Sequence, residues 1–243
     1  MKHSLKLTTL ACLAVCAPAH AANIAANYSD GDTISTTVIV GAGDRWQQAG
    51  ISITVGSGGF LDVQSSSESV NMNIGQLNTA TIIVDGGSLA LNGPNSLLLG
   101  NGSTGNGTID LRSGTFNSTP GATLFIGRDG ADGLLTIRGG SAVLGIQPTF
   151  DAVGSTAGDG TIDFADKIGG GTSDGTLTIT GADLSYYQAL YASGDLTING
   201  SNTNDFSNVF TVSGETISVI PEPGSFALLG LAALGLAARR RRL

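Results

Sequence analysis

A repeat of nearly constant length along the middle of the chain limits the possible folds more than any other feature. Three segments align: TIIVDGGSLALNGPNSLLLGNGSTGNG from Thr81, TIDLRSGTFNSTPGATLFIGRDGADG from Thr108 and LLTIRGGSAVLGIQPTFDAVGSTAGDG from Leu134. The glycine that closes each second apolar run falls at Gly75, Gly100, Gly127 and Gly154, so the spacing between these glycines is nearly constant. A fixed ~27-residue period is typical of chains built from stacked structural repeats.

The apolar runs within each repeat are short and alternate with polar residues, as in TLTI at 176–179 and DLTI at 195–198. Alternation predicts strands, and the glycine clusters between the runs predict sharp turns. An antiparallel β-sandwich would also have short strands, but nothing in a sandwich requires a fixed period. We therefore predict an all-β fold, a right-handed parallel β-helix of ~27-residue coils, with six or so coils spanning about 30 Å.

The period becomes irregular after Phe164. The piece ADKIGGGTSDG at 165–175 predicts an inserted loop. The piece ADLSYYQALYASG at 182–194 contains three of the four tyrosines, and Leu184, Tyr187 and Tyr191 would share a helical face. Because the strand pattern resumes at 196–198, we predict a degenerate coil or cap at 182–194, with a short helix as the alternative.

Residues 1–21 have the pattern of a secretory signal peptide, with two lysines, a short apolar run and small residues that predict cleavage after Ala21. A lipoprotein box ending at Cys16 is the alternative, but Val15 stands where a small residue is normally needed. Cleavage would remove every cysteine and histidine of the chain, which are Cys12, Cys16, His3 and His20. The mature chain would then have no thiol, no imidazole base and no His/Cys metal site.

The body between the two ends is strongly acidic. Residues 22–220 contain eighteen acidic and five basic side chains, a net charge of −13. Such a body repels the phosphates of nucleic acids, so nucleic acid is not an expected partner. The acidity is compatible with calcium binding or with simple solubility outside the cell.

The C-terminal tail has three parts. Residues 224–238 form an apolar run of fifteen residues, which predicts a single transmembrane helix of ~22 Å, short against a hydrocarbon core of about 30 Å. Four arginines after it, Arg239, Arg240, Arg241 and Arg242, would hold the end of the chain in the cytoplasm. Before it stand Pro221, Glu222 and Pro223, whose prolines favour an extended backbone that a membrane protease can bind.

These three parts resemble the PEP-CTERM sorting signal of Gram-negative bacteria, over residues 219–243. The repeats between residues 51 and 200 resemble the β-strand repeat of autotransporter passenger domains and PEP-CTERM proteins. The resemblance implies export by the Sec machinery and signal peptidase, transient anchoring in the inner membrane, processing by an exosortase, and release to the cell surface or matrix. A plain tail anchor is the alternative. The implied organisation is a signal peptide (1–21), a β-solenoid body (22–218) and a sorting signal (219–243).

Other residues offer weaker hypotheses. Asp110 and Asp163 each follow Gly-Thr-Ile and would lie two coils apart, ~10 Å, near the spacing of an inverting carboxylate pair. No histidine or clearly placed Arg or Lys supports them, so solvated turn carboxylates are the favoured interpretation. The turn at 127–133 weakly resembles a calcium-binding β-roll. Trp46 would cover the open end of the solenoid or, alternatively, stack on a sugar.

The sequence therefore predicts a non-enzymatic surface or extracellular-matrix protein, with no catalytic residues, metal or cofactor. Extracellular polysaccharide is a candidate partner. The alternative is a secreted β-helix protein that cleaves or binds carbohydrate.

Overall fold

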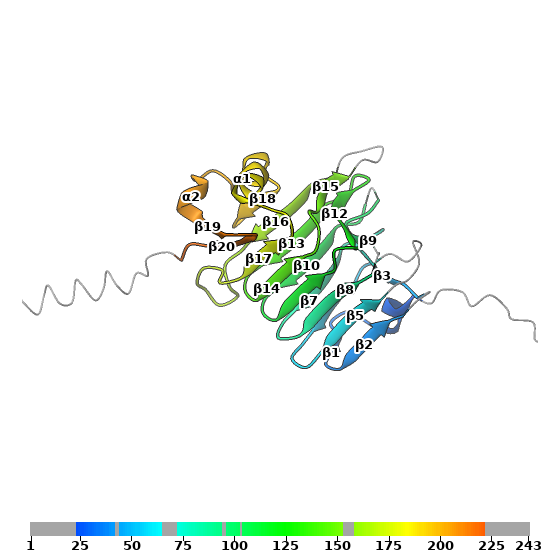
Figure 1. Ribbon diagram of the computed structural model, residues 1–243. Coiled ribbons are helices and arrows are strands. Elements are labelled where there is room, and N and C mark those ends of the chain that lie inside the picture. The colour runs from blue at the N-terminus through cyan, green and yellow to red at the C-terminus, as the bar shows by residue number, and fades with distance from the viewer. Residues whose placement is uncertain are drawn as a thin grey trace, which may run out of the picture.

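In the computed structural model, residues 23–41, 44–64, 72–93, 96–102, 104–152 and 158–221 are described. The signal peptide, most of the sorting signal and Gly154 lie outside these residues. The described chain winds through three sheets, each strand lying beside its counterpart from the next coil (Figure 1). Parallel pairing throughout the coils confirms the β-solenoid and rules out the antiparallel sandwich.

The three sheets differ in length. The first sheet has seven parallel strands: β1 (Thr33–Ile34), β4 (Ser52–Val55), β7 (Ala80–Val84), β10 (Gly107–Leu111), β13 (Gly133–Ile137), β16 (Gly160–Phe164) and β18 (Leu196–Ile198). The third sheet has five: β3 (Trp46–Gln48), β6 (Met72–Ile74), β9 (Ser96–Leu99), β12 (Thr123–Arg128) and β15 (Thr149–Ala152). The six steps from β1 to β18, at about 4.8 Å each, span roughly 29 Å.

The second sheet has eight strands and ends differently. Its parallel part consists of β2 (Thr37–Val40), β5 (Phe60–Gln64), β8 (Ser88–Asn92), β11 (Thr115–Ser118), β14 (Ser141–Leu144) and β17 (Thr176–Ile179). The hairpin of β19 (Phe210–Ser213) and β20 (Thr216–Val219) then adds to β17 in antiparallel orientation. The stacking of parallel coils in this sheet therefore stops at β17, before the predicted end of the body.

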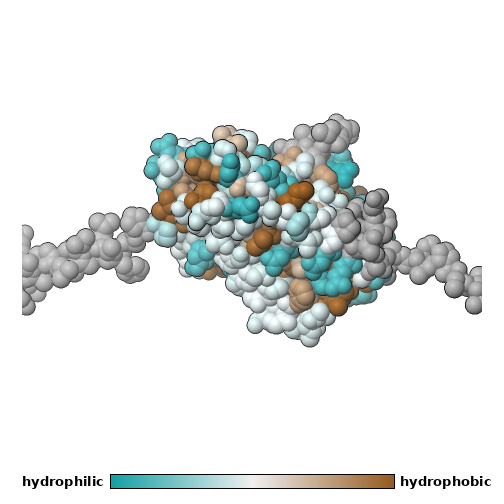
Figure 2. Space-filling model, viewed as in Figure 1, coloured by the Kyte–Doolittle hydropathy of each residue, from teal (hydrophilic) through white to brown (hydrophobic). Residues whose placement is uncertain are grey.

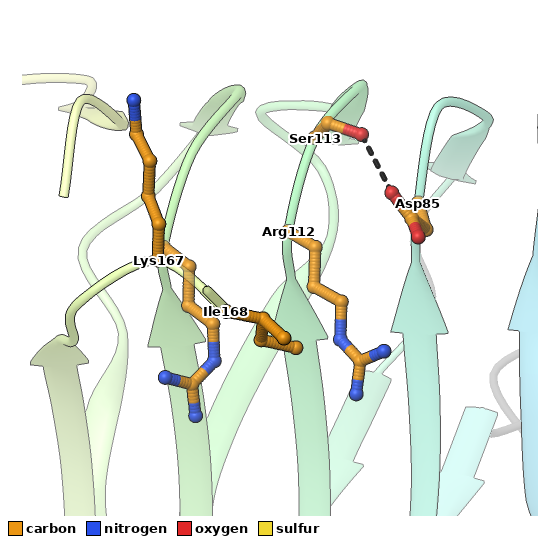
Figure 3. A pocket seen from close by; sticks show the side chains of 6 residues that line it. Asp85, Arg112, Ser113, Lys167 and Ile168 are labelled. Carbon is orange, nitrogen blue, oxygen red and sulfur yellow. Dashed lines mark hydrogen bonds between the residues drawn. The ribbon is translucent and has the colours of Figure 1, made fainter. Parts of the chain in front are cut away.

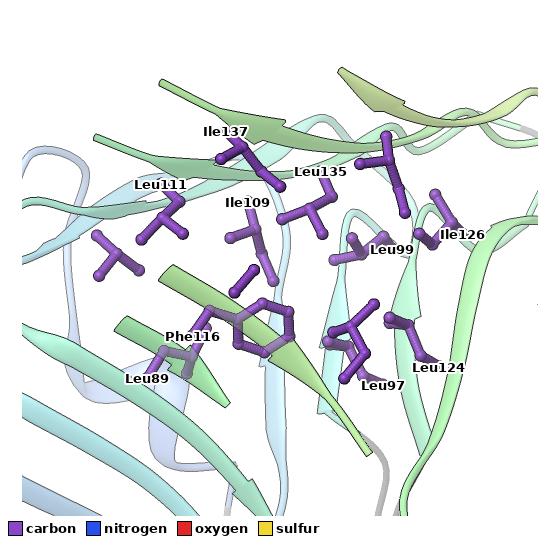
Figure 4. Close-up of a cluster of buried hydrophobic side chains, with 14 of the residues drawn as sticks. Leu89, Leu97, Leu99, Ile109, Leu111, Phe116, Leu124, Ile126, Leu135 and Ile137 are labelled. Carbon is purple, nitrogen blue, oxygen red and sulfur yellow. The ribbon is translucent and has the colours of Figure 1, made fainter. Parts of the chain in front are cut away.

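The pairing register explains the period. In the first sheet Ile82, Ile109, Leu135 and Ile162 stand opposite one another, and the sequence interval from each to the next is nearly constant. All four side chains are fully buried. Figure 4 shows Ile109 and Leu135 facing side chains of the other two sheets, among them Phe116 and Leu99. In a single coil these side chains would be exposed to water on both open sides. Stacking of coils buries them, and each large side chain then contributes about 1.5–3 kcal/mol to the stability of the fold.

The glycine series is confirmed for three members and wrong for the fourth. The register of the third sheet places Ile74, Leu99 and Ile126 in one row, so Gly75, Gly100 and Gly127 follow in the next. All three glycines have positive φ angles, which a Cβ would make unfavourable. The register from β12 to β15 pairs Arg128 with Ala152, so position 151, not Gly154, stands opposite Gly127.

The predicted loop at 165–175 is confirmed, since no strand occurs between β16 and β17. At 182–194 the degenerate coil is wrong and the alternative of a short helix is confirmed, because Leu184–Ser193 form the helix α1. This helix contributes to the cap described below, so the cap part of the prediction is confirmed. Asp183 caps its N-terminus by accepting a hydrogen bond from the Tyr186 amide, and Gly194 ends it with φ 95°. Because of these two insertions, the sequence interval between paired residues of β16 and β18 is longer than in the earlier coils.

Both ends of the described solenoid carry covering structure. At the N-terminal end the 3-10 helix η1 (Ile24–Asn27) packs on β3, and the fully buried Trp46 ring lies 5.6 Å from the Tyr28 ring. Trp46 donates its indole N–H to Gln48, which in turn donates to the Thr81 carbonyl. A buried ring cannot stack on a sugar, so the covering role predicted for Trp46 is confirmed and the sugar-stacking alternative is wrong.

The C-terminal end is covered by aromatic side chains from α1, the short helix α2 (Phe206–Val209) and the hairpin. The rings of Tyr191 and Phe206 both lie edge-on or tilted against Phe210, which also packs on Phe164 of β16. Tyr187 is fully buried, and its hydroxyl donates to the Glu215 carbonyl at 2.6 Å. This cluster seals the last coil of the first sheet from water.

Raising the pH is expected to loosen this end before the rest of the body. Burial, with a smaller contribution from Asp195, raises the pKa of Tyr186 to about 12, and burial also raises the pKa of Tyr187. Both phenols ionise near 10.0 when unfolded, so their contribution to stability is complete below that pH and is lost as the pH rises toward 12. Urea denaturation measured at several pH values between 10 and 12 should show that the midpoint urea concentration of unfolding falls as the pH rises.

The control for this effect is Tyr186→Phe, which removes one ionisable phenol and keeps the ring. The variant should match the wild type at neutral pH and lose less stability above pH 10. An identical alkaline slope in both proteins would exclude the contribution of Tyr186.

Candidate functional site

The start of the predicted sorting signal is held firmly by the body. Val219, the last residue of β20, stands opposite Phe210 and is buried. β20 lies between β17 and β19, so it is bonded on both sides, and the predicted domain boundary after residue 218 falls inside it. Ile220 then donates its amide to the Val209 carbonyl at 2.9 Å, while Pro221 is exposed. Pro221, the exposed residue that follows these contacts, is called the exit point below.

A cavity of about 340 Å³ adjoins this exit. Its walls combine asparagine side chains with apolar residues of α2, of β20 and of the position after β20: Asn199, Asn204, Asn208, Val209, Val219 and Ile220. Ile220 is 37% exposed, so the exit region presents an apolar side chain beside polar amides. Sequence reasoning missed this cavity because its walls come from segments that only the hairpin brings together.

The other predicted tail residues, Glu222, Pro223 and the four arginines Arg239, Arg240, Arg241 and Arg242, lie outside the described residues, as does Ala21. Among the residues that the structure describes, no helix is long and apolar enough to cross a membrane. The signal peptide and the transmembrane helix therefore stay predictions.

The carboxylates proposed as an enzymatic pair are two coils apart, as predicted, because Asp110 and Asp163 both stand opposite Thr136. Their surroundings differ from the prediction of solvated turn residues. Asp110 lies in β10 and is 7% exposed, with Arg112 at 2.8 Å on one oxygen and Arg138 at 2.9 Å on the other. Two basic residues are thus placed beside it, which the sequence analysis did not foresee.

Asp163 is also engaged by neighbouring groups. One of its oxygens accepts hydrogen bonds from the Thr197 hydroxyl at 2.7 Å and from the Gly200 amide at 2.8 Å. These bonds connect β16 to β18 and to the turn that follows it. Both carboxylates therefore bond adjacent coils together, which is a structural use of their charge.

Replacing Asp110 by asparagine is expected to lower the free energy of unfolding by about 2 kcal/mol, because two neighbouring guanidinium groups lose the charge between them. The matched control is Asp129→Asn. Asp129 pairs with Arg128 at 3.3 Å, but both side chains are more than a third exposed, so its loss should cost under about 0.5 kcal/mol. Urea denaturation measures both, and equal effects would contradict the bridging role of Asp110.

Backbone geometry alone accounts for the turn at 127–133. Arg128 and Ala131 form an isolated antiparallel bridge, and Asp129 and Gly130 supply the positive φ angles of a tight turn. In the described part of the chain, no three His, Cys, Asp or Glu side chains are grouped so as to hold a metal ion.

The fold and the exit point define a parallel β-solenoid with covered ends, whose last strand is followed by Ile220 and the exposed Pro221. Residues 219–242 match the family model described as the PEP-CTERM protein-sorting motif. The chain thus carries this motif, which implies an exported protein that an exosortase sorts at the membrane toward the cell surface. Neither a curated protein nor a solved structure matches the chain.

Proposed function

We propose that this chain is a non-enzymatic surface or extracellular-matrix protein. Its signal peptide directs export, its tail holds it transiently in the inner membrane, and an exosortase cleaves the tail to release the solenoid. The observation that carries the proposal is the position of the motif, which begins at the last residue of β20 and continues into the exposed Pro221. A protease can reach the peptide there without unfolding the body.

A structural role for the body is supported by how its polar groups are used. Asp110 and Asp163, the best candidates for a hydrolytic pair, are each bonded to groups of adjacent coils. General acid catalysis needs a carboxyl group that can exchange its proton with the substrate. The surface seen in Figure 2 is mostly of intermediate or polar hydropathy, which suits a protein exposed to water outside the cell.

The proposed sorting is tested by comparing cells with and without the exosortase gene. In its presence, the protein should be found at the surface or in the medium. In its absence, the full-length chain should collect in the inner-membrane fraction. The same distribution in both strains would overturn the role of the exosortase and leave the plain tail anchor.

The non-enzymatic role is tested separately, by incubating the released protein with polysaccharides and measuring reducing ends and unsaturated products. We expect no release above that of heat-denatured protein. Release that is lost in an Asp110→Asn, Asp163→Asn double variant shown by circular dichroism to be folded would instead establish the alternative, a carbohydrate-active β-helix.

A further inference from the structure

A shallow groove crosses the corner between the first and second sheets. It is lined by Asp85, Arg112, Ser113, Arg138, Lys167 and Ile168 and has a volume of about 330 Å³ (Figure 3). The lining residues follow the first-sheet strands of four successive coils, β7, β10, β13 and β16. The groove therefore runs along the solenoid, over roughly 14 Å at about 4.8 Å per coil.

The backbone ladder fixes this arrangement. The Arg112 amide donates to the Val84 carbonyl and the Arg138 amide to the Leu111 carbonyl, at 2.9 and 2.8 Å. Arg112 therefore lies between Asp85 of the preceding coil and Arg138 of the following coil. Three of the five basic residues of a body with net charge −13 meet in this one groove. Solubility alone does not require three basic side chains to be grouped at one place on the surface.

Hydrogen bonds hold the two arginine side chains in place but do not use all of their N–H groups within the described residues. Asp110 lies behind them and accepts one Nε–H from each, and Arg138 also donates from Nη1 to the Asp166 carbonyl at 2.8 Å. Within the described residues, the two terminal nitrogens of Arg112 have no hydrogen-bond partner. A guanidinium group fixed through its Nε and open at its terminal nitrogens is arranged to receive a carboxylate end-on.

The remaining groove residues suit a polyhydroxylated ligand. Asp85 accepts a hydrogen bond from the Ser113 hydroxyl at 2.9 Å, so this edge offers both acceptor and donor capacity (Figure 3). Lys167 pairs with Asp174 at 2.6 Å. Ile168 is 64% exposed and gives the groove an apolar wall, against which the C–H face of a sugar ring can pack.

The charge balance limits the ligand further. Three cations line the groove, but acidic residues offset their charge. Asp85 lies among them, Asp110 pairs with both arginines, and Asp174 pairs with Lys167. Asp166, whose carbonyl accepts a hydrogen bond from Arg138, lies nearby. A densely charged polyanion such as a nucleic acid gains little here and meets the acidic body on every side. A uronic acid chain, with one carboxylate on each ring and hydroxyl groups between the charges, fits better.

We propose that this groove binds an acidic glycan containing uronic acid residues. One uronate carboxylate is received by the terminal nitrogens of Arg112, ring hydroxyls bond to Asp85, Ser113 and Lys167, and the ring face lies on Ile168. Its volume is near the lower limit for small-ligand sites, so it holds a short stretch of polymer. This proposal concerns the body and does not depend on the sorting motif.

The test is isothermal titration calorimetry of the full chain with hexagalacturonate, in buffer without divalent cations, and with the neutral maltohexaose as comparison. We expect hexagalacturonate to bind, with affinity that falls as sodium chloride is added, and maltohexaose to bind at least tenfold more weakly. No binding of hexagalacturonate, or equal binding of the two glycans, would overturn the proposal.

Two variants locate the site. Ile168→Asp puts a carboxylate into the groove at an exposed position where folding should not suffer, and we expect at least a tenfold loss of hexagalacturonate affinity. Its matched control is Ile146→Asp, exposed by 40% and outside the groove, which should stay within twofold of the wild type.

Arg112→Gln should also weaken hexagalacturonate binding at least tenfold. Arg128→Gln, which makes the same charge change away from the groove, should not. Unchanged binding in both Ile168→Asp and a folded Arg112→Gln would exclude this groove as the site.

Discussion

Changing Pro221, Glu222 and Pro223 together to alanine is expected to stop processing without stopping export. The signal peptide acts at the other end of the chain, so the body should still be translocated. The uncleaved chain should then collect in the inner membrane, still carrying its apolar run and four arginines. Cell fractionation with detection of the body measures the effect, which should be nearly complete.

The physical reason lies in how the exit is built. Val219 and Ile220 are bonded into the hairpin region, and Pro221, which follows them, is exposed. Proline restricts the backbone to an extended form that a protease cleft can bind, whereas three alanines allow the apolar helix to extend toward the body.

The control changes the arginines instead. Replacing Arg239, Arg240, Arg241 and Arg242 by serine removes the charges that orient the tail and should loosen membrane retention. We expect the alanine variant to be retained in the membrane and the serine variant to leak out as unprocessed chain. These two outcomes distinguish recognition of the motif by the exosortase from anchoring of the tail in the membrane. If the alanine variant is released as efficiently as the wild type, the motif is not the processing signal.

The second large effect is expected from Gly107→Ala. Gly107 begins β10, at the corner where the chain passes from the third sheet to the first. A Cβ there would overlap the Ile74 carbonyl oxygen and the Gly100 amide nitrogen, both of them backbone atoms of neighbouring corners. Backbone cannot move aside as a flexible side chain can, so we expect a loss of about 3 kcal/mol or more in the free energy of unfolding.

Gly41→Ala is the matched control for this effect. A Cβ at Gly41 meets nothing within 4 Å, and its φ is not in the left-handed region. Its unfolding free energy should therefore change by no more than about 0.5 kcal/mol, or rise slightly. Urea denaturation followed by circular dichroism compares the two, and similar stabilities would show that the corners are not closely packed.

The period was enough to predict the solenoid because stacking imposes it. Each row of buried residues, such as Ile82, Ile109 and Leu135, has to recur at the coil length or leave the core. The same requirement fixes the corners, where Gly75, Gly100 and Gly127 recur in register. The spacing of buried residues and of corner glycines repeats in every coil, so a single sequence is enough to reveal it.

The helix α1 was within reach of sequence reasoning. Asp183 and Gly194 flank the segment as N-cap and C-cap residues, and this pair of signals outweighs the strand pattern that resumes afterwards. The final hairpin was not within reach. β20 pairs antiparallel with β17 and with β19, an arrangement set by the need to close an open edge and not by any pattern in residues 210–219.

The contacts of Asp110 also could not be predicted from the sequence alone. Arg138 is 28 residues away in sequence and reaches Asp110 because both lie on adjacent coils. Once the coil length is known, positions 110, 136 and 163 can be aligned, but the bend of a long arginine side chain toward one carboxylate follows from three-dimensional packing. The groove at Arg112 and Ile168 escaped prediction for this reason.

Intact-mass spectrometry of the protein released by wild-type cells tests the sorting function most directly. We predict a chain that begins at Ala22 and ends near the Pro221-Glu222-Pro223 motif, without the apolar run and the arginines that follow it. A released product that keeps Arg239 to Arg242 would contradict cleavage at the motif.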